Sequence, residues 1–215
     1  MHAQAAAASA EPQLEVRALH LWRGEKHLLR GVSFAVRPGE LLQIVGPNGV
    51  GKTSLLRCVA GLLPVESGEI LWRNRLLEHS RDEYHQQLAY LAHNNALKAE
   101  LTALENLRFS ASLRRRVGQT DLREVLARLQ IPSCADLPVR AMSAGQKRRV
   151  ALARILLSHA PLWILDEPIT NLDVAGVALF EECMAEHLSA GGLILTAAHQ
   201  QLLRGRSAVR TLELR

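Results

Sequence analysis

Residues 46–53 read GPNGVGKT, and their glycines, lysine and threonine have spacings suited to holding a nucleotide phosphate. The glycines let backbone N–H groups curl around the phosphate, and a following helix would point its positive end at the same anion. Lys52 can reach the β and γ oxygens of ATP, and the Thr53 hydroxyl can ligate Mg²⁺. We therefore predict nucleotide binding by the whole stretch, named here the phosphate loop: Gly46, Pro47, Asn48, Gly49, Val50, Gly51, Lys52 and Thr53.

Two acidic residues follow a second apolar stretch, LWIL, at 162–165. Asp166, at the end of a predicted strand, is placed to complete a Mg²⁺ shell with Thr53. Glu167, the next residue, is placed to polarise an attacking water. A strand that ends in an acid is a weak signal alone, but it is strong beside a phosphate loop. The pair predicts ATP hydrolysis, with ATP and Mg²⁺ as the cofactors.

Residues 141–157, AMSAGQKRRVALARILL, are compatible with two functions. Basic side chains in this stretch could contact nucleic acid: Lys147, Arg148, Arg149 and Arg154. They alternate with apolar residues that must be buried, so we expect them on the solvated face of an amphipathic helix. Ser143 is a suitable N-cap and Gly145 permits close backbone approach, so the helix start offers a second anion site. We favour a phosphate site over a nucleic-acid site.

The surrounding elements must place these residues together. The apolar run LLQIV (41–45) leads into the phosphate loop, and a helix follows it. Alternating residues at 14–22 and 27–36 predict antiparallel strands, and residues from about 84 to 158 have mainly helical spacing. We predict an α/β fold with a mixed β core, an antiparallel β edge and a helical subdomain at roughly 84–158.

The N-terminal segment and the composition of the chain limit the class of protein to which it can belong. The alanine-rich segment 1–13 predicts a disordered tail rather than a signal peptide, and 14–215 a single domain. A net charge of +5 favours nucleic acid, nucleotide phosphates or an anionic membrane without choosing among them. Three separated cysteines do not form a metal-binding pattern. Since no run approaches the ~18 apolar residues of a membrane span, we expect a soluble chain that only a partner brings to a membrane.

These motifs together resemble the ATP-binding-cassette (ABC) ATPases. MSAGQ (142–146) resembles the LSGGQ signature of that family, and TNLD (170–173) resembles its D-loop. The resemblance implies that a signature loop contacts ATP held by the phosphate loop of a second chain: Ser143, Ala144, Gly145 and Gln146. It also implies that Asp173 lies near the contact between the two chains. His199, 32 residues after Glu167, occupies the position of the switch histidine, a second catalytic residue.

Three positions depart from the family pattern. Ala144 stands where the signature usually has glycine, and Asn94 stands at the Q-loop position, where glutamine is usual. Asn94 carries the same amide on a shorter side chain and could still meet Mg²⁺ or water. Trp22 is the candidate for stacking on adenine, although Arg23 stands at the usual aromatic position.

Two longer stretches, 84–109 and 137–173, resemble the ATP-binding subunits of the cytochrome c maturation (haem exporter) system. That resemblance implies a peripheral protein on the cytoplasmic face of the bacterial inner membrane. Its implied partners are a second copy of itself, a multi-span membrane subunit, and the proteins that handle haem and its chaperone, with no nucleic acid. ATP hydrolysis would drive either haem export or release of the haem-loaded chaperone.

Two alternatives remain open at this point. The chain could be the ATPase of another small ABC exporter. It could instead be a soluble ABC protein that acts on nucleic acid or on protein assembly.

Overall fold

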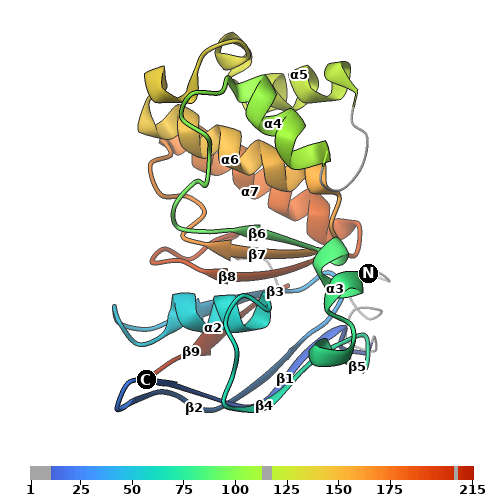
Figure 1. The fold of residues 1–215 in the computed structure, drawn as a ribbon, viewed down its shortest axis with the longest axis vertical. Coiled ribbons are helices and arrows are strands. Elements are labelled where there is room, and N and C mark those ends of the chain that lie inside the picture. The colour runs from blue at the N-terminus through green and yellow to red at the C-terminus, as the bar shows by residue number, and fades with distance from the viewer. Residues whose placement is uncertain (1–10, 113–117, 206–207) are drawn as a thin grey trace.

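A five-stranded parallel sheet forms the centre of the molecule, with strand order β6-β7-β8-β3-β9. The computed structural model describes residues 11–112, 118–205 and 208–215 (Figure 1). The strands are β3 (Leu41–Val45), β6 (Leu88–Leu91), β7 (Leu162–Asp166), β8 (Leu193–Ala197) and β9 (Val209–Glu213). Parallel strands end at one edge of a sheet, so the loops after β3, β6, β7 and β8 lie at a common edge.

An antiparallel sheet lies below the parallel one, with strand order β2-β1-β4-β5 (Figure 1). Its strands are β1 (Leu14–Arg23), β2 (Lys26–Val36), β4 (Ser67–Trp72) and β5 (Arg75–Leu76). Gly24, with φ of 58°, lies in the tight turn between β1 and β2. The predicted antiparallel edge is therefore confirmed.

One helix lies between the two sheets, and others cover the far face of the parallel sheet (Figure 1). Helix α2 (Lys52–Val59) lies between the two sheets, where Leu55 belongs to the same buried cluster as Val16 of β1 and Ile164 of β7. Helices α6 (Ala144–Ser158) and α7 (Val174–Ser189) cover the other face. The phosphate loop is thus anchored at both ends by buried elements.

The helical region begins later than predicted. Helix α3 (Arg81–Gln87) is followed by β6, which pairs in parallel with β7 and belongs to the central sheet. The remaining helices are α4 (Ala103–Ser112) and α5 (Gln119–Arg128), with short 3₁₀ turns at Leu77–His79, Pro132–Cys134 and Val139–Ala141. The predicted start near residue 84 is wrong because LAYL, a four-residue apolar run, is too short to distinguish a strand from a helix by periodicity.

The N-terminal segment joins the structure just before β1. Residues 1–10 of the predicted tail lie outside the described residues. The last residue of that tail, Gln13, is part of the fold: its N–H donates to the Val36 carbonyl at 3.0 Å. The Gln13 carbonyl accepts from the Arg73 N–H at 2.7 Å.

The three cysteines are buried and free. Within the described ranges, every helix is too short or too polar to cross a bilayer.

Candidate functional site

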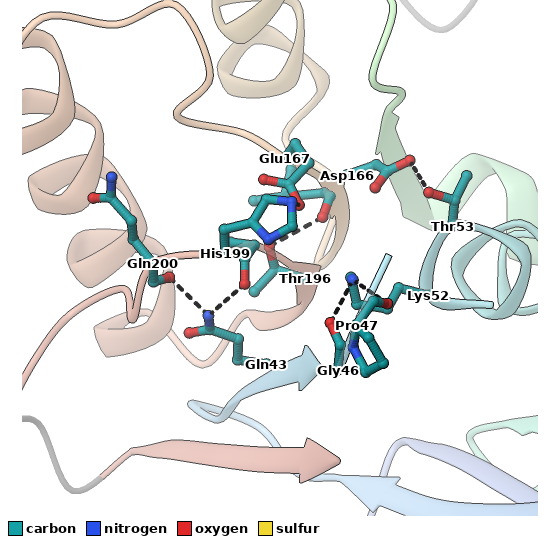
Figure 2. A network of polar contacts seen from close by, with 12 residues as sticks. Gln43, Gly46, Pro47, Lys52, Thr53, Asp166, Glu167, Thr196, His199 and Gln200 are labelled. Atoms are coloured by element: carbon teal, nitrogen blue, oxygen red, sulfur yellow. Dashed lines mark hydrogen bonds and ion pairs between the residues drawn. The ribbon is translucent and has the colours of Figure 1, made fainter. Parts of the chain in front are cut away.

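The backbone of the phosphate loop is held by hydrogen bonds from its lysine and by close packing at its first glycine. Lys52 Nζ donates to the carbonyl oxygens of Gly46 at 2.7 Å and Pro47 at 3.0 Å (Figure 2). Gly46 has a φ of 146°, and a Cβ there would lie 2.5 Å from the Leu214 carbonyl oxygen. Only glycine fits that position. Lys52 is 9% exposed, so its ammonium group is largely shielded from bulk water.

Thr53 and Asp166 bring oxygen ligands together from two elements. The Thr53 hydroxyl, on α2, donates to Asp166 Oδ2, at the end of β7, at 2.9 Å (Figure 2). Burial raises the pKa of the Asp166 carboxyl, and the Thr53 hydrogen bond partly offsets that rise. Hydroxyl and carboxylate oxygens are ligands that Mg²⁺ prefers, and a cation here would also stabilise the buried carboxylate. This pair therefore fits the predicted metal site.

A cavity of about 350 Å³ opens over these residues, at the edge where the parallel strands end. It is lined by Leu28, Asn48, Gly49, Gly51, Lys52, Thr53, Ser54, His93, Asp166, Glu167 and His199. We name it the carboxyl-edge cavity. From three separate segments, it brings together the lysine, both carboxylates and the histidine that the sequence indicated.

Glu167 has an unusual backbone conformation. Its φ is +48°, in the left-handed region, and its N–H donates to the Ala197 carbonyl at 2.8 Å. His199 Nε2 lies 3.5 Å from Glu167 Oε1, and the imidazole is largely exposed (Figure 2). The structure thus places the predicted water-polarising acid and the predicted switch histidine side by side.

Gln43 holds the loop that carries His199, a role that sequence reasoning missed. Its buried side chain, on β3, donates to the carbonyls of Ala198 at 3.2 Å and Gln200 at 2.8 Å. Its Oε1 accepts from the Leu202 N–H at 3.2 Å. A glutamine in the middle of the apolar run LLQIV was the available signal, because a buried amide requires hydrogen-bond partners.

The signature loop forms the N-terminus of α6. Ser143 is the N-cap, as predicted: its Oγ accepts from the Gln146 N–H at 3.1 Å, and Gln146 Oε1 accepts from the Ser143 N–H at 2.8 Å. This capping box occupies the Gln146 side chain. A Cβ on Gly145 would lie 3.0 Å from the Asn171 carbonyl oxygen. The close approach that glycine permits is therefore to the D-loop of the same chain.

The basic residues of α6 do not form a solvated face, so that expectation is wrong. Arg148 is 1% exposed. Arg149 donates to the Leu129 carbonyl at 2.9 Å and to Asp173 Oδ1 at 2.6 Å, and Arg154 donates to the carbonyls of Asn95 and Ala96. Guanidinium groups on long stems reach past the helix to backbone carbonyls and a carboxylate of other segments, and periodicity does not reveal these contacts.

Asp173 caps helix α7. Its Oδ1 accepts from the Gly176 N–H at 2.9 Å as well as from Arg149. The Gly176 hydrogen bond, followed by that of Arg149, lowers the pKa of the Asp173 carboxyl. These contacts fix the D-loop within the chain, and the role of Asp173 between two chains stays a prediction.

Two other predicted residues lie outside the carboxyl-edge cavity. Asn94 lines a neighbouring cavity of about 360 Å³, whereas His93, which sequence reasoning missed, faces the carboxyl-edge cavity. Nothing in the run His93-Asn94-Asn95 distinguished the residue that faces inward. Trp22 stacks on His27, with ring centroids 4.1 Å apart, and is 46% exposed. The roles of Asn94 and Trp22 stay predictions.

Asn94→Gln tests the Q-loop assignment. If the Asn94 amide meets Mg²⁺ or the attacking water, the longer glutamine should leave ATP turnover unchanged or raise it, because the amide then reaches further. Phosphate release at saturating ATP measures the effect. His93→Ala is the comparison variant, and a large loss from Asn94→Gln would show that the role is misplaced.

Comparison with known proteins gives the family. The sequence model of the family described as "ABC transporter" matches residues 29–170. The chain is 45% identical over 202 residues to "Cytochrome c biogenesis ATP-binding export protein CcmA" of Vibrio cholerae serotype O1, covering 94% of this chain and 98% of that protein. The protein of the same name from Escherichia coli O157:H7 is 46% identical over 202 residues, covering 94% and 96%.

Solved structures agree with this. "Structure of ATP binding subunit of ABC transporter" aligns with a TM-score of 0.79 and 28% identity, covering 87% of this chain and 80% of that one. A putative ABC transporter ATP-binding protein from Pyrococcus furiosus aligns with a TM-score of 0.81 over 94% and 96%, and its 23% identity supports the fold alone. The chain belongs to the ABC transporter family as an ATP-hydrolysing subunit, and within that family to the CcmA group.

Proposed function

We propose that this chain supplies the energy for a membrane complex of c-type cytochrome biogenesis by hydrolysing ATP. The observation that carries the proposal is the carboxyl-edge cavity, in which Lys52, Asp166 and Glu167 converge. The choice of process rests on relatives named for cytochrome c biogenesis and export, at 45% and 46% identity over 94% of the chain.

The residues predicted from the sequence each have a part in the proposed reaction. Lys52 binds the β and γ phosphate oxygens, and the phosphate loop amides surround them. Thr53 and Asp166 hold Mg²⁺, which when bound neutralises charge on the phosphates. Glu167 polarises the attacking water, and His199, 3.5 Å from it, contacts the same water and the γ-phosphate. Trp22 stacks on the adenine ring.

A second copy of the chain completes the site in this proposal. Ser143 and Ala144 are exposed at the N-terminus of α6, which carries a partial positive charge. With Gly145 and Gln146 they would face the γ-phosphate on the phosphate loop of the partner chain. ATP would thus hold two chains together, and hydrolysis would release them.

We place the membrane subunit at the cavity that Asn94 lines. Phe109, on its rim, is 48% exposed, and the Lys98 ammonium lies 4.5 Å from the centre of its ring. Aromatic residues are enriched at protein interfaces relative to the rest of the surface. Asn94 adjoins His93, so a partner bound here would contact the loop that lines the carboxyl-edge cavity. The chain would then be peripheral, on the cytoplasmic face of the inner membrane.

Phe109→Glu should weaken this docking. Burying a carboxylate at an apolar contact is unfavourable, so we expect co-sedimentation with host membranes to fall about tenfold or more. Leu62→Glu is the matched control, because Leu62 is 52% exposed and lies away from this cavity. Equal losses in both variants, or none in either, would contradict the assignment.

Covalently bound haem in c-type cytochromes tests the proposed function. The gene is deleted in its host and complemented with wild type or with Glu167→Gln. We expect loss of bound haem on deletion and recovery with wild type only. Haem retained on the periplasmic chaperone in the mutant would indicate that hydrolysis drives chaperone release, and its absence would indicate haem export.

Normal cytochromes in every strain would overturn the assignment. The ATPase would then belong to another small exporter if it still co-purifies with membranes. It would be a soluble ABC protein if it does not and if nucleic acid changes its ATP turnover. The cytochrome proposal predicts neither result.

A further inference from the structure

Arg148 is buried at a point where three functional segments meet. It is the largest fully buried side chain of the described residues, and within those residues only oxygen atoms of carbonyl groups accept its hydrogen bonds. The acceptors are Ala92 O (3.2 Å), His93 O (3.4 Å), Asn95 Oδ1 (2.9 Å), Asp166 O (3.0 Å), Glu167 O and Pro168 O (3.0 Å). One guanidinium therefore joins α6 to the loop after β6 and to the loop after β7.

Three of these hydrogen bonds go to the backbone of residues 166–168, the segment that contains Glu167. Three consecutive carbonyls, those of Asp166, Glu167 and Pro168, accept from Nη2 and Nε of Arg148. Such carbonyls lie too deep for bulk water to replace the arginine, because Asp166 is 2% exposed and Arg148 1%. Losing the guanidinium would leave several buried acceptors without donors, which proteins avoid.

The conformation of Glu167 requires such support. A φ of +48° is unfavourable for a residue with a side chain, and it persists only where neighbouring groups fix it. The Glu167 N–H is held by the Ala197 carbonyl, and the Glu167 carbonyl is held by Arg148. This conformation directs the carboxylate toward His199 (Figure 2).

The same guanidinium fixes the backbone of His93. Its Nη1 donates to the carbonyls of Ala92 and His93 and to the Asn95 side chain, while the His93 side chain lines the carboxyl-edge cavity. His93 lies in the loop after β6 and Glu167 in the loop after β7, and Arg148 donates hydrogen bonds to the backbone of both. Arg148 thus links the two loops beyond the point where the pairing of β6 with β7 ends.

We propose that Arg148 is a positioning residue for ATP hydrolysis, which fixes Glu167 and His93 relative to each other and to the helix that begins at the signature loop. The inference rests on the proposed role of Glu167 in polarising the attacking water. Burial lowers the pKa of Arg148 to about 10, and the charges of Asp166 and Glu167 oppose that shift. The guanidinium therefore stays charged at neutral pH and keeps all its donors.

Lysine should replace this arginine only in part. Arginine offers five N–H donors in one plane, whereas lysine offers three from a single atom. A lysine ammonium at position 148 can satisfy one of the two loops and not both. Arg148→Lys should accordingly retain the fold and lose part of the rate, while Arg148→Met should lose more.

The test compares ATP turnover and ATP binding in the full chain. We expect kcat to fall about 100-fold in Arg148→Met, the size of loss that misplacement of a catalytic group by about 1 Å can cause, and less in Arg148→Lys. The KM for ATP and the affinity for Mg-ATP should stay near wild type, because the phosphate loop is untouched. Hydrogen exchange should increase in peptides covering 88–97 and 162–171 and remain unchanged in α2.

Leu152→Ala is the matched control for lost stability. Leu152 is also buried on α6, at 1% exposure, and none of its side-chain atoms can hydrogen-bond the catalytic loops. We expect a lower unfolding midpoint with unchanged kcat, measured at a temperature where every variant is folded. The same kcat loss in Leu152→Ala, or wild-type kcat in a folded Arg148→Met, would overturn the proposal.

Glu167→Gln, assayed in parallel, separates this inference from the one on which it rests. If Glu167→Gln keeps wild-type turnover, the role of Glu167 fails and the positioning role fails with it. If Glu167→Gln loses turnover but both Arg148 variants do not, only the positioning role is wrong. Because the assay contains no cytochrome, neither outcome depends on the biogenesis assignment. Should Arg148→Met fail to fold, Arg148→Lys decides the question.

Discussion

Glu167→Gln is expected to lower ATP turnover by about 10²–10⁴-fold while ATP still binds. A positioned general base contributes a factor of that size, and the amide keeps the shape of the side chain without its basicity. Lys52, Thr53 and Asp166, which hold the phosphates and the metal in our proposal, are unchanged. Chains should therefore bind ATP, close on each other and remain closed. Phosphate release measures the turnover, and light scattering with ATP present measures the dimer.

Glu182→Gln is the control for this prediction, because Glu182 is an exposed carboxylate on α7 outside the carboxyl-edge cavity. It should hydrolyse ATP at the wild-type rate. If Glu167→Gln does so too, another group polarises the water. A monomer that persists at saturating ATP would contradict the two-chain site while leaving the hydrolytic role of Glu167 intact.

Lys52→Ala should weaken ATP binding by about 100-fold. Hydrogen bonds to charged groups contribute about 1.5–3 kcal/mol each, and about 1.4 kcal/mol corresponds to a factor of ten. The substitution also removes the donor to the Gly46 and Pro47 carbonyls, so the loop loses an internal support. Titration calorimetry with Mg-ATP gives the affinity directly.

Lys26→Ala provides the comparison, since Lys26 is an exposed lysine at the start of β2. Its affinity for ATP should match wild type. Lys52→Met, which keeps the length of the stem but lacks the charge, should resemble Lys52→Ala. Wild-type affinity in Lys52→Met would mean that the charge does not bind phosphate.

Much of the site could be predicted because most of its residues lie in short, continuous sequence motifs. The phosphate loop, its flanking strand and helix, and the acids after β7 each occupy a short continuous stretch, so spacing alone indicates their geometry. The N-cap at Ser143 was equally local. The antiparallel edge followed from alternation at 14–22 and 27–36, which half-buried strands require.

The missed features depend on contacts between distant segments. Nothing near Arg148 indicates that its acceptors lie at 92–95 and 166–168, and a basic residue in an amphipathic helix is usually exposed. His93 and Asn94 are adjacent polar residues, and only the path of the loop after β6 determines which one faces the cavity. Strand β6 could not be recognised because its apolar run is only four residues long. Gln43 was the exception, because a polar residue inside an apolar strand is visible in the sequence.

Gly145 also limits how the signature can change during evolution. A Cβ at position 145 would lie 3.0 Å from the Asn171 carbonyl oxygen, so alanine would require the D-loop to move by a few tenths of an ångström. Position 144 is exposed, and it already carries a methyl group in place of the usual glycine. Two neighbouring positions therefore differ in tolerance: 144 accepts small side chains, whereas a side chain at 145 would press on the backbone of the D-loop.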